Sequence, residues 1–121
     1  RGEAGRLELK ALHDFAYQAP LLLACFSVPK ESHIPLWEQQ LSAGAAIAQL
    51  MLAASAHGFV ANWLTGPVAS LPGIGEELGV PGGTVAGFVF IGTPTRPLEE
   101  RPRPALETVV LRFPPPISES A

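Results

Sequence analysis

The spacing of apolar and polar side chains divides the chain into a small number of helices and strands. Residues 1–18 combine charged side chains with an imperfect apolar face, so we predict a helix that Pro20 ends. The continuous apolar run at 21–28 predicts a strand that is covered on both faces. Residues 84–91 are rich in β-branched and aromatic side chains and predict the clearest strand of the chain.

The longest predicted element is a helix over Pro35–His57. Proline is tolerated in the first turn of a helix, and Gly58 can adopt the left-handed backbone that often ends one. No Asp, Glu, Lys or Arg occurs between Glu38 and Glu76. The middle of the helix has little side-chain volume, and Gly44 costs about 1 kcal/mol there relative to Ala. We therefore expect another helix or a planar ligand to pack closely against it.

Weaker signals fill the remaining sequence. We predict a short helix at 74–78, a turn at 81–83, a proline- and arginine-rich arm at 93–104, and a last strand at 108–113. Together the elements indicate an α+β fold: a thin β-sheet packed on a long central helix, with an extended C-terminal arm. A sheet of two or three strands is marginal by itself in water.

Length and charge limit the organisation and the partners. The 121 residues have room for one domain, which we divide into an N-terminal helix (1–18), a core (19–94), and an arm with a tail (95–121). The formal net charge of −3, without a basic stripe, gives no reason to expect nucleic acid as a partner. Cys25 lies in an apolar run and has no second cysteine to pair with, which indicates an inert core thiol and fits a cytoplasmic location.

Membrane insertion and metal chemistry find little support. Residues 41–60 are long enough to span a bilayer, but Ala, Ser and Gly dominate them and no basic cluster or aromatic belt brackets them. We therefore predict no membrane association. The three histidines are far apart in the sequence and have no cysteine companions, so we expect no metal site. No Ser-His-acid set or pair of carboxylates indicates a catalytic residue.

Two segments carry candidate binding chemistry. Trp63-Leu64-Thr65-Gly66 is predicted to be a tight turn whose backbone N–H groups can point at a ligand. The alternative is a simple helix exit that buries Trp63. Arg101 and Arg103 project from a stiff, proline-containing segment, and a guanidinium group suits phosphate. The alternative is that both arginines are solvated surface residues.

Several segments between Ala19 and Phe113 share an order and spacing with a known family. They are Ala19-Pro20-Leu21-Leu22-Leu23, His33-Ile34-Pro35, Trp37-Glu38-Gln39, Leu41-Ser42-Ala43-Gly44-Ala45-Ala46, Gly58-Phe59, Trp63-Leu64-Thr65-Gly66, Val85-Ala86-Gly87-Phe88-Val89-Phe90-Ile91-Gly92-Thr93-Pro94 and Arg101-Pro102-Arg103-Pro104. Taken together, these segments resemble the nitroreductase family of FMN-dependent NAD(P)H oxidoreductases, in particular its branch of small members. No single segment is diagnostic, and the signal comes from their common register.

The resemblance implies a homodimer that pairs through the Pro35–His57 helix and binds FMN in a cleft made by both chains. The turn of Trp63, Leu64, Thr65 and Gly66 would face the flavin ring, with its backbone amides stabilising charge on the reduced ring. Hydride would pass from NAD(P)H to the flavin and then to a nitroaromatic or quinone-like acceptor.

The resemblance also implies a role for the arm and a departure from the family. Arg103, together with Arg101, matches a position that meets the FMN phosphate. Family members carry a further N-terminal region, with an Arg-rich motif that holds FMN, before the segment at which this sequence begins. We therefore expect the C-terminal portion of a nitroreductase-like protein. Three alternatives stay open: a fragment of a longer protein, a second polypeptide that supplies the rest, or a non-catalytic dimerisation or binding module without flavin.

Overall fold

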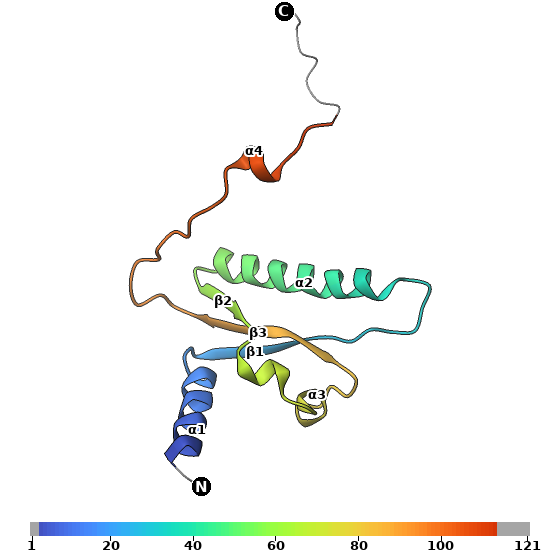
Figure 1. Ribbon diagram of the computed structural model, residues 1–121. Helices are drawn as coiled ribbons and strands as arrows, with labels where there is room; N and C mark the ends of the chain where they lie inside the picture. Colours follow the sequence, from blue (N-terminus) through green and yellow to red (C-terminus); the bar gives the residue numbers. More distant parts are fainter. Residues whose placement is uncertain (1–2, 114–121) are drawn as a thin grey trace, which may run out of the picture.

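The computed structural model describes residues 3–113 and is built around a three-stranded antiparallel sheet (Figure 1). The strands are β1 (Leu21–Ser27), β2 (Val60–Leu64) and β3 (Thr84–Gly92), in the order β1-β3-β2. β3 is therefore the central strand and pairs with both neighbours. Each of the other two strands leaves one edge without a partner strand among the described residues.

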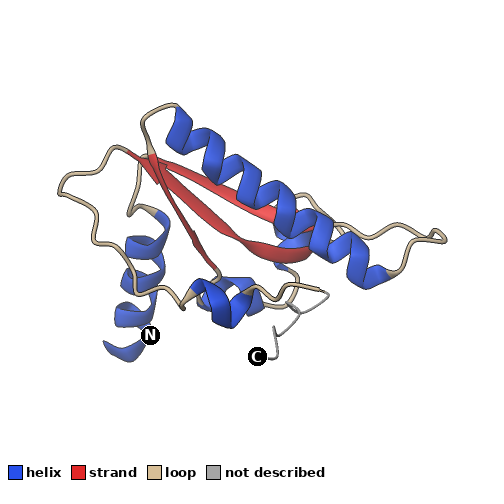
Figure 2. Ribbon diagram, turned by 90° about the horizontal axis from the view of Figure 1, so that it is seen from above, coloured by secondary structure: helices blue, strands red, loops and turns tan. Residues whose placement is uncertain are grey.

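Helices lie on both sides of this sheet (Figures 1 and 2). The long α2 (Leu36–Ala56) crosses one face, whereas α1 (Glu3–Ala16), the 3₁₀ turn η1 (Pro67–Ser70) and α3 (Ile74–Glu77) lie toward the other. After β3 the chain leaves the body as an extended arm that contains the short α4 (Leu106–Val109). The arrangement is a thin sheet between one long helix and several short helical pieces.

The core of the molecule is formed around β3. Val89 is fully buried and packs with Ile91 against Ile47 of α2. Because successive side chains of a strand point to opposite faces, Phe88 and Phe90 face the other side. There the ring of Phe15 meets both edge-on, with ring centroids 5.8 and 5.1 Å apart. Each such aromatic pair adds about 0.5–1.5 kcal/mol beyond the burial itself.

The structure confirms most of the predicted elements. The α+β class, the long helix, the short helix near residue 74 and the strong strand before residue 92 are all present. Pro35 and His57 flank α2 as its capping residues, and Gly58 has the expected left-handed backbone with a φ of 82°. The extended arm is also confirmed.

Three predictions of local structure are wrong. The apolar run at 21–28 forms an edge strand, so it is only partly covered; β3 is the strand that is buried on both faces. Val60–Leu64 forms a strand that the sequence did not indicate, because its pairing with β3 is a tertiary effect. Residues 108–113 do not form a strand: Leu106–Val109 is helical and the chain after it is irregular, since no strand lies beside it.

The small-residue middle of α2 also packs differently from the expectation. A Cβ atom added at Gly44 would have one neighbouring side chain or backbone within 4 Å, the indole of Trp63, whose Cη2 atom lies 3.8 Å away. The planar group against this glycine is thus a side chain of the same chain. The part of the chain that the structure describes contains no helix with the length and apolar character needed to cross a membrane.

Replacing Gly44 by Ala should stabilise the fold. The added methyl group would make ordinary van der Waals contact with Trp63, and the helix would gain roughly 0.5–1 kcal/mol of backbone propensity. Urea unfolding, followed by circular dichroism, measures the change. Gly92→Ala is the matched control, because its new Cβ atom would lie only 2.9 Å from Cδ of Pro20 and should destabilise. A loss of stability in Gly44→Ala would show that something else occupies the space beside the glycine.

Candidate functional site

A hollow of about 600 Å³ lies over the end of the sheet where β2 begins and β3 ends. One wall comes from the first three residues of β2 and the end of β3, and a second from the segment between α1 and β1. The beginning of the arm forms the third wall. The lining residues are Gln18, Ala19, Pro20, Val60, Ala61, Asn62, Phe90, Gly92, Thr93, Pro94, Thr95, Arg96 and Leu98. The volume lies within the range of roughly 300–1,000 Å³ that small-molecule sites have.

The hollow is lined by both apolar and polar groups. Pro20 and Phe90 supply apolar surface, whereas Asn62, Thr95 and Arg96 supply an amide, a hydroxyl and a guanidinium group. Arg96 is the one basic residue among those that line it, and it takes part in none of the ion pairs found within residues 3–113. The arrangement suits a ligand with a flat apolar part and an anionic group.

Arg96 is not among the residues that the sequence pattern indicated. Arg101 and Arg103 stand out there by their proline-separated spacing, although Arg96 lies closer to the end of β3 in the same arm. Its place shortly after a strand was the available signal, because loops that follow a rigid strand are held in position and often carry binding residues.

Residues 63–66 are placed differently from the predicted four-residue turn. Trp63 and Leu64 are the last residues of β2, and the turn proper consists of Thr65 and Gly66. Gly66 has a φ of 60°, and a Cβ atom there would lie 2.7 Å from the ring of Phe15. The turn therefore requires glycine at position 66 and packs against Phe15 of α1. Thr65 is exposed.

Arg101 and Arg103 lie in the arm, and both are exposed. The Nε–H of Arg103 donates a 2.8 Å hydrogen bond to Oε1 of Glu100, which is also an ion pair on the surface. Neither arginine lines the hollow. The structure thus places both arginines in the exposed arm, which leaves the sheet after β3 and not at the turn at Thr65.

The strand register separates the turn at Thr65 from the start of the arm. Val60 pairs with Gly92, from which the arm departs, and Leu64 pairs with Phe88. The turn and the start of the arm therefore lie at opposite ends of β2, about 13 Å apart for four residues of strand. The hollow extends along the first part of this distance.

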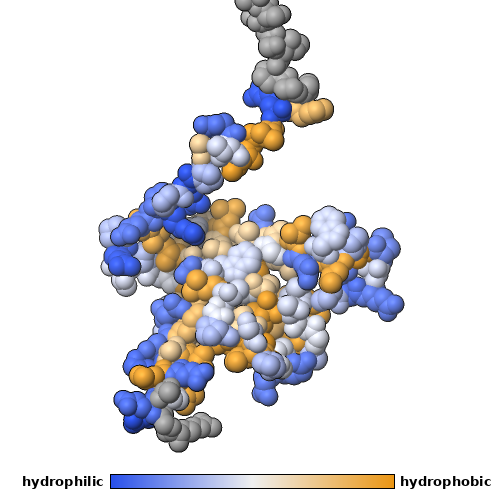
Figure 3. Space-filling model, in the orientation of Figure 1, coloured by the Kyte–Doolittle hydropathy of each residue, from blue (hydrophilic) through white to orange (hydrophobic). Residues whose placement is uncertain are grey.

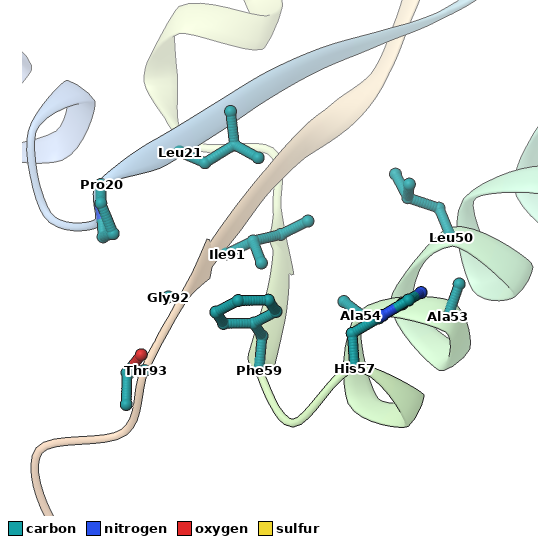
Figure 4. Close-up of a pocket in the computed structure, with 10 residues that line it drawn as sticks. All are labelled: Pro20, Leu21, Leu50, Ala53, Ala54, His57, Phe59, Ile91, Gly92 and Thr93. Atoms are coloured by element: carbon teal, nitrogen blue, oxygen red, sulfur yellow. The ribbon is translucent and has the colours of Figure 1, made fainter.

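A second, more apolar hollow of about 410 Å³ lies on the α2 side of the sheet (Figure 4). Leu50, Ala53 and His57 border it from the C-terminal end of α2, facing Leu21 and Ile91 of the sheet. The contact between Pro20 and Gly92 is common to both hollows. With so few polar groups in its lining, this hollow can bury apolar surface but offers little that would fix the orientation of a polar ligand.

One face of α2 points away from the sheet, and we call it the outer face. It is uncharged and is made of Leu41, Ala45, Ala48 and Leu52. These residues follow one another at helical spacing and all are exposed; the two leucines are 65% and 66% exposed. In Figure 3 the surface along α2 is mainly pale to orange. Contiguous apolar surface of this kind usually marks an interaction site.

Comparison with known proteins shows one consistent family. The nitroreductase family matches residues 3–93. Two bacterial relatives are named "Putative NAD(P)H nitroreductase": YdjA of Escherichia coli K12, 35% identical over 64% of this chain and 44% of its own length, and one from Haemophilus influenzae, 33% identical over 75% of this chain and 51% of its own. The chain therefore spans about half the length of the curated relatives it matches.

One solved structure has a similar fold. A nitroreductase-like family protein from Bacillus cereus superimposes with a TM-score of 0.75 at 20% sequence identity. The alignment covers 94% of this chain and 62% of that protein. The fold of this chain is thus similar to that of part of a larger protein.

Cys25 should react slowly with alkylating reagents. Burial raises the pKa of its thiol, so less of the reactive thiolate is present at neutral pH than in a free cysteine. We expect the rate of iodoacetamide labelling per thiol to be lower than that of glutathione at pH 7.5, and to increase as the pH rises toward the raised pKa. Intact mass spectrometry follows the reaction, and the urea-unfolded chain is the control. Equal rates in the folded and unfolded chain would contradict the protected position.

Proposed function

The chain belongs to the nitroreductase family, and we propose that it forms the C-terminal part of an FMN-dependent oxidoreductase that passes a hydride from NAD(P)H to a nitroaromatic or quinone-like acceptor. The observation that carries this proposal is the family match over residues 3–93. The α+β fold, the long helix and the turn after β2 support it. The aligned part of the chain covers 44% and 51% of the two relatives, so the activity is proposed for a longer protein and not for this chain alone.

The described residues fit part of an FMN site. An elongated ligand along the open side of β2 would meet the hollow with Arg96 at one end and the Thr65–Gly66 turn at the other. Arg96 would contribute positive charge toward the phosphate, and we keep the proposal that Arg101 and Arg103 assist it. The segment from Trp63 to Gly66 would lie toward the flavin ring. When bound, FMN supplies the redox chemistry, accepting and returning the hydride.

We further propose that the protein is a homodimer that pairs through the α2 helix, within the Pro35–His57 segment. The uncharged outer face of α2 supports this, because it would be costly to leave in water. Leu36 is exposed as well, at the N-terminal end of the same helix. A second copy that covered these side chains would stabilise the chain by burying apolar surface.

The remaining proposals concern organisation and location. We propose that 1–121 is a single domain, divided into a helix (1–18), a core (19–94) and an arm with a tail (95–121). A protected, lone thiol at Cys25 supports a reducing, cytoplasmic location.

Replacing Arg96 by Ala should weaken FMN binding by about tenfold or more, because a hydrogen-bonded charge pair is worth roughly 1.5–3 kcal/mol. Arg103→Ala should have a smaller effect, since Arg103 is already paired with Glu100. Quenching of flavin fluorescence during titration of the purified chain gives both dissociation constants.

The control for this experiment is Arg6→Ala, which removes an equal charge from α1, outside the hollow. An equal loss in all three variants would indicate only a general effect of net charge. A wild-type chain that takes up no FMN would remove the flavin proposal for this chain and favour the non-catalytic dimerisation module.

Replacing Ala48 by Glu should convert the dimer to a monomer. The new carboxylate would lie in the middle of the outer face of α2, where pairing would bury it without a partner. Light scattering after size-exclusion chromatography measures the mass, and Ala11→Glu on α1 is the matched control at another exposed alanine. If Ala48→Glu has the same mass as the wild type, α2 does not form the subunit contact.

A further inference from the structure

The side chain of Trp63 is 37% exposed and is fixed to its own subunit by a specific hydrogen bond. Its indole Nε1–H donates to the backbone carbonyl of Ala86, with 3.0 Å between nitrogen and oxygen. The far edge of the ring lies over Gly44 of α2, where Cη2 is 3.8 Å from the position of an added Cβ. The indole therefore bridges β3 and α2 and lines, together with Gly44 and Ala86, a small hollow between them.

The backbone of β3 is adapted to this side chain. Cys25 pairs with Gly87, but the next residue, Phe26, pairs with Val85, so Ala86 has no partner in β1. This β-bulge lies at the residue whose carbonyl oxygen accepts the hydrogen bond from Trp63. A β-bulge interrupts the ladder and re-aims the residues beside it.

Gly87 supplies the space that the indole needs. A Cβ atom at Gly87 would lie 2.0 Å from Nε1 of Trp63 and 2.5 Å from Cδ1. No other residue type could stand there without moving the ring. A glycine within a strand weakens the strand, as a glycine within a helix weakens the helix. Gly87 and the bulge at Ala86 are thus two locally unfavourable features that meet at one side chain.

A single residue, Leu64, separates Trp63 from the turn that is proposed to lie beside the flavin. Leu64 ends β2, and Thr65 and Gly66 follow directly. On the opposite face of the sheet, the ring of Phe15 lies against Gly66. The turn is therefore held from two sides, by Trp63 against α2 and by Phe15 against the sheet.

We propose that Trp63 is a positioning residue: its indole, bonded to the bulged Ala86 carbonyl and seated between Gly44 and Gly87, fixes the backbone of the Thr65–Gly66 turn. In this assignment the turn meets the ligand and the Trp63 ring does not. The inference deepens the proposed flavin site and rests on it for the identity of the ligand. The positioning of the turn itself is measurable without flavin.

The test compares Trp63→Phe with Trp37→Phe in the purified chain. Trp63→Phe keeps a flat ring but removes the N–H donor. Trp37 is exposed and makes none of the side-chain hydrogen bonds found among residues 3–113, so the same substitution there is the matched control. In ¹H–¹⁵N spectra, Trp63→Phe should shift the backbone amide signals of Thr65 and Gly66. The β2 amides should exchange with solvent about tenfold faster, as expected for a locally loosened strand end.

Gly87→Ala provides a second route to the same result, because its methyl group would displace the indole while the donor stays in the sequence. It should move the same two amide signals as Trp63→Phe. If Trp63→Phe folds and leaves the Thr65 and Gly66 signals unchanged, the positioning role is overturned.

Flavin titration separates this inference from the proposed function. Trp63→Phe should raise the dissociation constant of FMN about fivefold, which corresponds to the free energy of about one hydrogen bond. The fluorescence of the bound flavin should stay the same. A change in that fluorescence with unmoved amide signals would show direct ring contact and overturn the inference. If the wild type binds no FMN while the amide signals still respond to Trp63→Phe, the positioning stands and the flavin proposal fails.

Discussion

The burial of β3 between α2 and Phe15 is the interaction on which the rest of this structure depends. Four consecutive residues, from Phe88 to Ile91, are buried, and their side chains alternate between the two faces of the sheet. Val89 and Ile91 hold α2, whereas Phe88 and Phe90 hold the end of α1. β1 and β2 are kept in place by pairing with this strand, so the positions of the hollow and the turn follow from it.

A single buried strand gives a small core, and this has consequences for the surface. Most large apolar side chains in the described part of the chain keep more than a third of their surface in contact with solvent. The exposed leucines of α2 are of this kind, and so are those of α1. A core of this size stabilises the central elements but does not cover the outer ones, so additional contacts would contribute a large share of the total stability.

The sequence predicted those elements whose signal is local. The length, capping and composition of α2 lie within its own residues, as does the β-branched and aromatic character of β3. Val60–Leu64 has no such signal: Asn62 is unfavourable in a strand, and the segment becomes a strand because β3 offers a free edge. Residues 108–113 show the converse, since a strand-like composition does not form a strand without a neighbour. The hollow could not be predicted either, because its walls come from three distant segments.

The role of Gly44 shows why a sequence signal can be correct while its interpretation is wrong. A glycine inside a long helix indicated that something flat approaches the backbone, and a flat group is indeed present. The sequence could not identify that group as Trp63, 19 residues further on, because the contact depends on β2 returning beneath α2. Gly87 and the bulge at Ala86 lie beside the same ring, which argues that the fold has specified where the indole lies. The outer face of α2 is then free for a different contact, because Gly44 is already covered from inside.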